Sequence, residues 1–215
     1  MMKKNIRDTT FKSAAESVAK NAAKNIVENP DGRRTRGQAN KRSIVVALSD
    51  LIREGVVAPT AEQVAAKAGV GLRSVFRHFD DMETLYREIA NELDQLVQPS
   101  VQKRLKSKDW HSRLAESIEL RALVFEGLMP FHIASEVHRQ ESPFLNAQQV
   151  KSASLQRELL RHLLPKELVL DKTRFEALNL VLSMDAWLRL RREQGLSKSA
   201  AKRVMQHAAA ALTAG

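Results

Sequence analysis

The chain has 215 residues, no cysteine and a formal net charge of +10. This length allows one large domain or two small ones, and the lack of cysteine excludes disulfides and thiolate metal sites. The basic N-terminus is followed by no apolar run, so we expect no signal peptide, and no stretch is apolar enough to predict a membrane helix. We therefore expect a soluble, intracellular protein.

The basic residues are concentrated in the first third of the chain. Up to Phe79 there are 15 Lys and Arg residues against 7 Asp and Glu, whereas the remainder has 20 against 18. This distribution is expected when one part of a protein meets an anionic polymer and the other part does not. A solvated basic face would show the same distribution, so charge alone leaves both interpretations open.

Apolar residues recur at helical spacing and seldom alternate, which predicts an all-α fold. A leading helix is expected over 9–28, followed by a break at 29–32 and a short basic arm at 33–36. The first strongly amphipathic helix is expected over 38–54, with Gly55 ending it. Later helices are expected over 81–98, 110–127, 130–140, 143–163, 171–194 and 197–213.

The most informative pattern occupies 59–89, PTAEQVAAKAGVGLRSVFRHFDDMETLYREI. Thr60 and Gln63 have the spacing of a capping box, which predicts the start of a short helix. Gly69 is expected to end that helix, and Gly71 to precede a second one. Two short helices joined by a glycine-containing turn form the DNA-binding helix-turn-helix, so the pattern predicts that motif.

The second helix is expected over 72–79, with Val75 and Phe79 facing inward because they are four residues apart. Its outer face then carries Arg73, Ser74 and Arg77, flanked by Leu72, Phe76 and His78. Arginine can pair with a guanine edge or a phosphate, and serine can donate to either. No acid occurs between Lys67 and Asp80, so no carboxylate on this helix is expected to repel DNA.

The stretch TAEQVAAKAGVGLRSVFRHFDDMETLYREI resembles the N-terminal domain of the TetR family of bacterial transcriptional regulators. Members commonly show a turn like AGVS, a helix like TLYRHF and then a helix with an acidic or polar cap. The match covers about 38–89. It is looser towards the C-terminus, where DAWLRLRREQGLS resembles the last two helices of several members. The resemblance implies an all-α homodimer of about nine helices, with a three-helix DNA-binding head and a ligand-sensing, dimerising body.

The resemblance divides the chain into an N-terminal extension or basic arm (1–35), a helix-turn-helix DNA-binding domain (36–84), and an effector-binding and dimerisation domain (85–215). The residues expected at DNA are Arg36, Lys41, Arg42, Thr60, Gly71, Leu72, Arg73, Ser74, Phe76, Arg77 and His78.

Two positions depart from the family pattern. Many members have a tyrosine where Phe76 stands and a lysine where Met82 stands, and both of those side chains reach phosphate. We therefore expect this head to depend more on its other basic residues, including an arm that enters the minor groove. A tail without function would be equally consistent with the sequence.

The resemblance also implies an effector cavity among the middle helices. Its expected lining is Leu93, Leu120, Arg121, Val124, Phe125, Met129, Phe131, Phe144 and Met184, which is mostly apolar, as ligand sites are. Arg121 would pair there with an anionic ligand, although an exposed or salt-bridged arginine is the more ordinary interpretation. The expected dimer contacts are Phe175, Leu178, Leu182, Trp187, Val204, Ala208 and Ala211, a pattern that an internal core helix would also show.

No pattern in the chain predicts a metal site, a cofactor or an enzyme. The six histidines include no HExxH pair, and the sequence contains no phosphate-binding glycine loop and no nucleophile elbow. We expect a ligand-responsive transcriptional repressor that binds a palindromic operator as a homodimer, in the bacterial cytoplasm at the nucleoid. The alternatives are a sequence-tolerant architectural DNA-binding protein without an effector, and an all-α interaction or enzymatic domain on the same fold.

Overall fold

The computed structural model describes residues 32–101 and 105–214. Within these ranges the chain forms ten α-helices and one π-helical segment, with no strand, so the predicted all-α fold is confirmed. No helix in the described part is long and apolar enough to cross a membrane. The helix expected over 9–28 lies outside the described residues.

The chain forms two compact units. Among the described residues, the first contains 32–51 and 59–81, and the second contains 52–58, 82–101 and 105–214. The sequence-based division falls after residue 84, close to the passage between the units at 81–82. The sequence did not indicate that 52–58 belong to the second unit, because the composition of this short segment does not set it apart from its neighbours.

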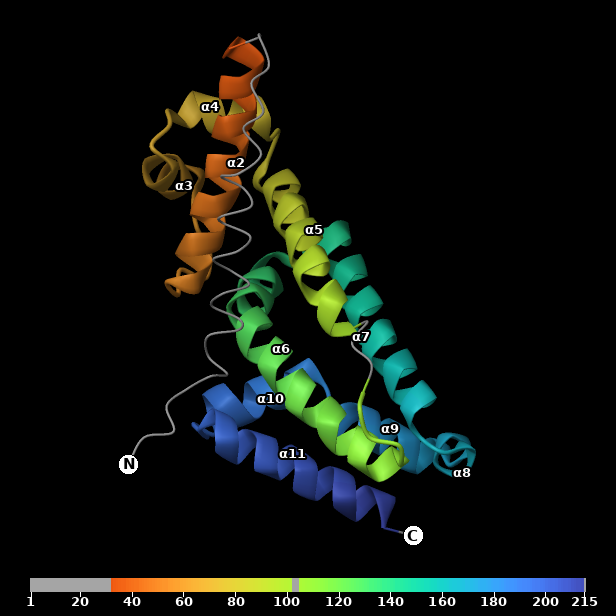
Figure 1. Cartoon of the computed structure of the whole chain (residues 1–215). Coiled ribbons are helices and arrows are strands. Elements are labelled where there is room, and N and C mark those ends of the chain that lie inside the picture. Colours follow the sequence, from red (N-terminus) through yellow and green to blue (C-terminus); the bar gives the residue numbers. More distant parts are fainter. Residues whose placement is uncertain (1–31, 102–104, 215) are drawn as a thin grey trace, which may run out of the picture. The chain divides into compact units, whose positions relative to one another are not determined.

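The first unit is built from α2 (Gly32–Arg53) up to Leu51, α3 (Ala61–Ala68) and α4 (Leu72–His78) (Figure 1). Its buried side chains come from all three helices and include Ile44, Val45, Leu48, Val64, Ala65 and Val75. α2 begins at Gly32, so the basic arm expected at 33–36 is corrected: these residues form the first turn of the helix. Arginine and glutamine are good helix formers, and they extend the helix back from the apolar stripe that predicted it.

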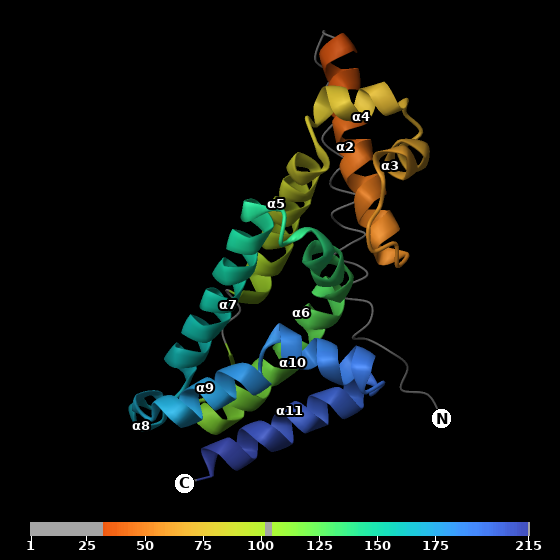
Figure 2. The ribbon, with the colours of Figure 1, turned by 180° about the vertical axis from the view of Figure 1, so that it is seen from behind.

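The second unit consists of α5 (Met82–Val101), α6 (Trp110–His138), α7 (Pro143–Leu163), α8 (Lys166–Leu170), α9 (Lys172–Val181), α10 (Met184–Leu188), a π-helical segment (Arg189–Glu193) and α11 (Lys198–Thr213). Two groups of helices are visible in it: α5 lies beside α7, and α11 lies along α6 and α9 (Figures 1 and 2). Its main apolar core includes Ile118, Phe125, Leu178, Trp187 and Met205.

Two prolines lie inside helices instead of ending them. α5 continues through Pro99 to Val101, and α6 continues through Pro130, so the separate helices expected over 110–127 and 130–140 are one. A proline removes one backbone donor. Around Pro130, the buried Phe125 and Phe131 pack on either side of the missing hydrogen bond, whereas α5 has no buried residue next to Pro99. The two halves of α6 run in different directions (Figure 2), which is the bend expected at an internal proline.

The single helix expected over 171–194 is also corrected. The chain breaks after Val181, where the Oγ of Ser183 accepts a hydrogen bond from the backbone N–H of Ala186 at 3.1 Å and caps α10. A serine that can cap its own chain competes with helix continuation, which apolar periodicity does not reveal. α8 was not predicted, whereas the helices expected over 143–163 and 197–213 are confirmed as α7 and α11.

Candidate functional site

α3 and α4 are joined by a three-residue turn whose geometry is set by capping interactions. Thr60 Oγ1 accepts a hydrogen bond from the Gln63 N–H at 3.3 Å, and Gln63 Oε1 accepts one from the Thr60 N–H at 2.9 Å. After α3, Gly69 adopts the left-handed conformation with φ 67°, and the Val70 N–H donates to the Ala65 carbonyl at 3.1 Å. The predicted capping box and glycine helix end are therefore confirmed.

α4 has one buried face and one exposed face. Val75 on the helix and Phe79 just after it are each 2% exposed, so both point inward as predicted. The outer face combines the exposed arginines Arg73 and Arg77 with Phe76, which is 49% exposed. Neither arginine forms an ion pair with any residue that the structure describes. These guanidinium groups are thus available to an external partner.

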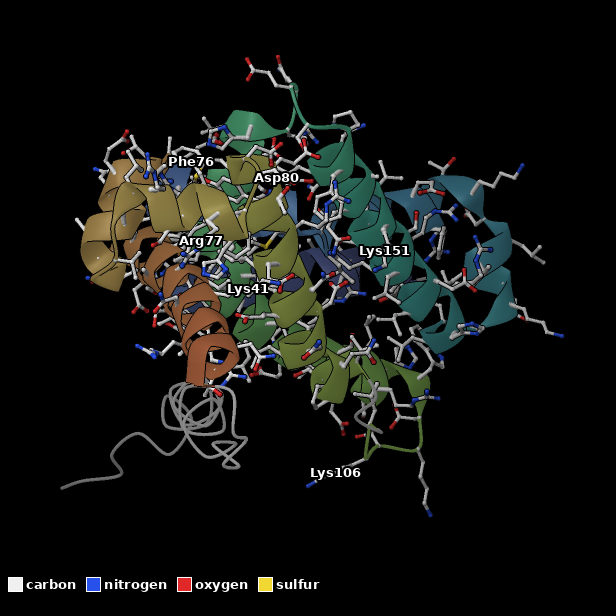
Figure 3. All side chains as sticks on the ribbon, turned by 90° about the horizontal axis from the view of Figure 1, so that it is seen from above. Lys41, Phe76, Arg77, Asp80, Lys106 and Lys151 are labelled. Atoms are coloured by element: carbon white, nitrogen blue, oxygen red, sulfur yellow. The ribbon has the colours of Figure 1, made fainter. Side chains whose placement is uncertain are left out.

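His78 lies in a basic environment made by α2 and α4. Partial burial lowers the pKa of His78, and the positive charges of Arg77 and Lys41 lower it further. The imidazole is therefore neutral at neutral pH. Its Nε2 is buried and has no hydrogen-bond partner in the described chain. Arg77 lies on the side of α4 that is nearer to Lys41, and Phe76 lies on the other edge of α4 (Figure 3).

The remaining residues predicted at DNA all lie in the first unit. Arg36 and Arg42 are exposed on α2, and Leu72 is exposed at the start of α4. Gly71 is also exposed, and Ser74 is half-buried. The side-chain oxygen of Thr60 is already engaged as the cap of α3, a structural use of a residue that was also expected at DNA.

The second unit contains a cavity of about 720 Å³, lined mainly by side chains from α5, α6, α7, α9 and α10. This volume lies within the range of small-molecule binding sites. Seven of the residues expected to line an effector cavity lie on its wall: Leu93, Leu120, Arg121, Val124, Phe125, Phe131 and Met184. Met129 and Phe144 are not on this wall: Met129 packs against the apolar core, and the Phe144 ring lies 4.0 Å from the Arg87 guanidinium.

Arg121 lies in the cavity wall and is neither exposed nor salt-bridged within the described residues, which corrects the more ordinary interpretation of it. Its Nη1 donates to the Leu182 carbonyl at 3.2 Å, and its Nη2 donates to the Gln156 carbonyl at 3.1 Å. Burial lowers the pKa of Arg121 to about 10, so the side chain remains charged at neutral pH. Its positive charge thus faces the cavity with carbonyl dipoles as its only described partners.

The sequence reasoning missed most of the polar side chains in the wall. They include Asp94, Arg113, Ser117, His132, Gln148, Ser152, Gln156, Asn179, Ser183 and Asp185. Polar residues at helical spacing normally indicate a solvent-facing surface, so no signal in the sequence marked them as part of a cavity.

The seven predicted dimer residues divide into two groups. Phe175, Leu178, Leu182 and Trp187 are buried in the core of the second unit, which corresponds to the alternative of an internal core helix. Val204 is 44% exposed, Ala211 is exposed and Ala208 is half-buried, all on α11. A partner reaches the first group only if the core opens, whereas the α11 residues are accessible.

No protein-family model matches the sequence, and no curated protein is similar to it. In the residues that the structure describes, no group of three or more His, Asp or Glu is arranged to hold a metal ion.

Proposed function

We propose that this protein is a DNA-binding transcriptional regulator that reads its operator with α4 and responds to a small molecule bound in the second unit. The outer face of α4 carries the proposal. Arg73 and Arg77 project from a short helix fixed from behind by Val75 and Phe79, and no described ion pair engages them. Their arrangement supports contact with an external anion.

The chemistry of this face suits DNA better than a simple anion. Arginine pairs with the acceptor edge of guanine in the major groove, and apolar side chains contact the thymine methyl group. The face offers both kinds of side chain, because Leu72 and Phe76 are exposed next to the arginines. An α-helix fits the major groove, and a helix-turn-helix presents its second helix there.

The surroundings of α4 supply sequence-independent contacts. Lys41 and His78 lie near Arg77, and the exposed Arg36 and Arg42 lie on the neighbouring helix α2. Basic side chains of this kind bind phosphates and hold a reading helix in register without reading sequence. In a homodimer, two copies of α4 would meet half-sites about one helical turn apart.

Selection of bound duplexes from a random pool, followed by titration of the selected and random DNA at one salt concentration, tests the proposal. We expect a near-palindromic site bound at least about a thousandfold more tightly than random duplex. Equal affinity for both duplexes would replace the proposal with the architectural alternative. No binding even at low salt would overturn it and favour an interaction or enzymatic domain.

The cavity supports the ligand-response half of the proposal. A regulator of this kind should release its operator when a ligand binds the second unit, because the ligand favours one of two conformations. Thermal-shift hits from a small-molecule library can be tested in competition with operator DNA. Compounds that bind and fail to alter DNA affinity would show that the cavity does not control DNA binding by the first unit.

A further inference from the structure

We infer that the cavity of the second unit binds an aliphatic carboxylate and that the ligand's carboxylate group pairs with Arg121. The inference rests on the proposed function only for its consequence, control of DNA binding. Binding itself depends on the charges and surfaces of the cavity.

The acidic side chains of the cavity wall already have partners. Asp94 accepts hydrogen bonds from Gln148 Nε2 at 3.1 Å and from Lys151 Nζ at 3.0 Å. Asp185 Oδ1 lies 3.3 Å from His132 Nε2, and this contact lowers the pKa of Asp185. A cationic ligand would have to displace these partners to reach a carboxylate.

The two arginines of the wall lack such compensation. Arg121 is held by two backbone carbonyls, and Arg113 forms no ion pair within the described ranges. Burying a positive charge against neutral dipoles is unfavourable compared with pairing it with an anion. The lowered pKa of Arg121 has burial as its cause, with no carboxylate opposing the shift. A ligand carboxylate would supply the missing negative charge.

Arg121 is better suited than Arg113 to hold a carboxylate. The two lie on the same face of α6, two turns or about 12 Å apart. Arg121 keeps N–H groups beyond the two that its carbonyl bonds use, and arginine binds carboxylates with paired donors. The amides of Gln156 and Asn179 also line the cavity, and neither has a side-chain hydrogen-bond partner among the described residues. They can complete the donor set.

The remainder of the wall fits an unbranched hydrocarbon chain. Aliphatic side chains from three helices line the cavity: Leu93 and Val97 of α5, Leu120, Val124 and Leu128 of α6, and Leu155, Leu159 and Leu163 of α7. At about 720 Å³ the cavity has room for much more than a carboxylate head group. Burial of each additional methylene against these side chains strengthens binding.

The test compares three ligands with the same tail: decanoate, decanol and decyltrimethylammonium. Isothermal titration of the full chain without DNA should show decanoate binding about tenfold or more tightly than decanol, because an ionic hydrogen bond is worth this much. The trimethylammonium compound should bind most weakly. Absence of decanoate binding, or equal affinity for decanoate and decanol, would overturn the inference.

Variants locate the head group. Arg121→Gln should remove the preference for decanoate over decanol while decanol still binds, and Arg121→Lys should keep part of it because the charge remains. Circular dichroism checks the fold of both variants, since Arg121 also holds two carbonyls. If Arg121→Gln does not fold, the Lys variant and the three-ligand comparison still decide whether the ligand's carboxylate pairs with Arg121.

Two further arginine variants serve as comparisons. Arg113→Gln should lower decanoate affinity less than Arg121→Gln does, and a larger effect at Arg113 would move the carboxylate to that residue and overturn the assignment. Arg203→Gln, on the exposed side of α11, should change nothing. A protein that binds decanoate and no DNA would refute the proposed function alone, whereas DNA binding without decanoate binding would refute this inference alone.

Discussion

The two units differ in how they hold their uncompensated positive charge. In the first unit Arg73 and Arg77 project into solvent, where water stabilises them, whereas in the second unit Arg121 lies in the wall of a cavity and burial lowers its pKa. Exposed charges attract a polyanion from a distance and are screened by salt. A buried charge is screened much less and suits one small anion of fitting shape. We therefore expect the same residue type to take part in two kinds of recognition in one chain.

Salt should separate the two kinds of recognition most strongly. Raising salt from about 50 mM to about 200 mM should weaken operator binding by about a thousandfold, if a dimer neutralises roughly six phosphates and releases their counterions. Decanoate affinity should change by less than about threefold over the same range, because its charge pairs inside the cavity. Anisotropy and calorimetric titrations measure the two responses. Parallel salt slopes would contradict the distinction.

Loss of the largest buried side chain should affect stability without affecting the reading of DNA. Trp187 is fully buried, and its Nε1 donates to Glu126 Oε1 at 3.0 Å. Trp187→Ala should lower the free energy of unfolding by about 3–5 kcal/mol, measured by urea denaturation. The exposed Val204→Ala should change it by less than about 0.5 kcal/mol. Equal effects of the two variants would contradict the description of this core.

Truncation of one arginine on α4 should weaken DNA binding and leave stability unchanged. Arg77→Ala should weaken operator binding by about 1–3 kcal/mol, because a bidentate base contact is lost. Thermal stability should stay unchanged, since Arg77 forms no ion pair with a described residue. Lys202→Ala on α11 serves as a control of equal charge change and should leave operator affinity within about twofold. Normal operator binding by Arg77→Ala would remove this residue from the interface.

The smallest expected effect is a pH dependence of the first unit. The pKa of His78 is lower in the folded protein than its ordinary value of 6.5, so the unfolded chain binds more protons as pH falls below that value. Stability should therefore decrease from about pH 7 to about pH 5, and more so in the wild type than in His78→Gln. Urea denaturation of both proteins measures the difference. Identical pH profiles would show that His78 titrates as it does when unfolded.

The features of this chain that could be predicted from the sequence are those set by residues close to one another in it. Thr60 with Gln63 marked the start of α3, Gly69 marked its end, and the spacing of Val75 and Phe79 identified the inner face of α4. Each signal depends on interactions between residues close in sequence, which the order of residues specifies directly. The limits of α3 and the inner face of α4 followed from such signals, whereas the start of α2 at Gly32 did not.

The second unit was less predictable because its features depend on which residues cover one another. Apolar periodicity marked Phe175 and Trp187 as buried, and it did not distinguish their own core from a partner subunit. From the sequence, an exposed or salt-bridged Arg121 was the more ordinary interpretation. The carbonyls that accept its hydrogen bonds come from α7 and from the break before α10, which are distant in sequence. Such long-range relations have no signature within a window of sequence.

Pro130 has a consequence for how this protein can vary. Without an amide hydrogen at this position, the carbonyl of Glu126 has no donor in the next turn of α6, and the helix bends there. Pro130→Ala would restore that hydrogen bond and straighten α6, the longest of the described helices. Such a substitution gains stability in an ordinary helix, and here it would reshape the wall that carries Arg121, Phe125 and Phe131. A substitution at Pro130 therefore changes the stability of α6 and the shape of the cavity together.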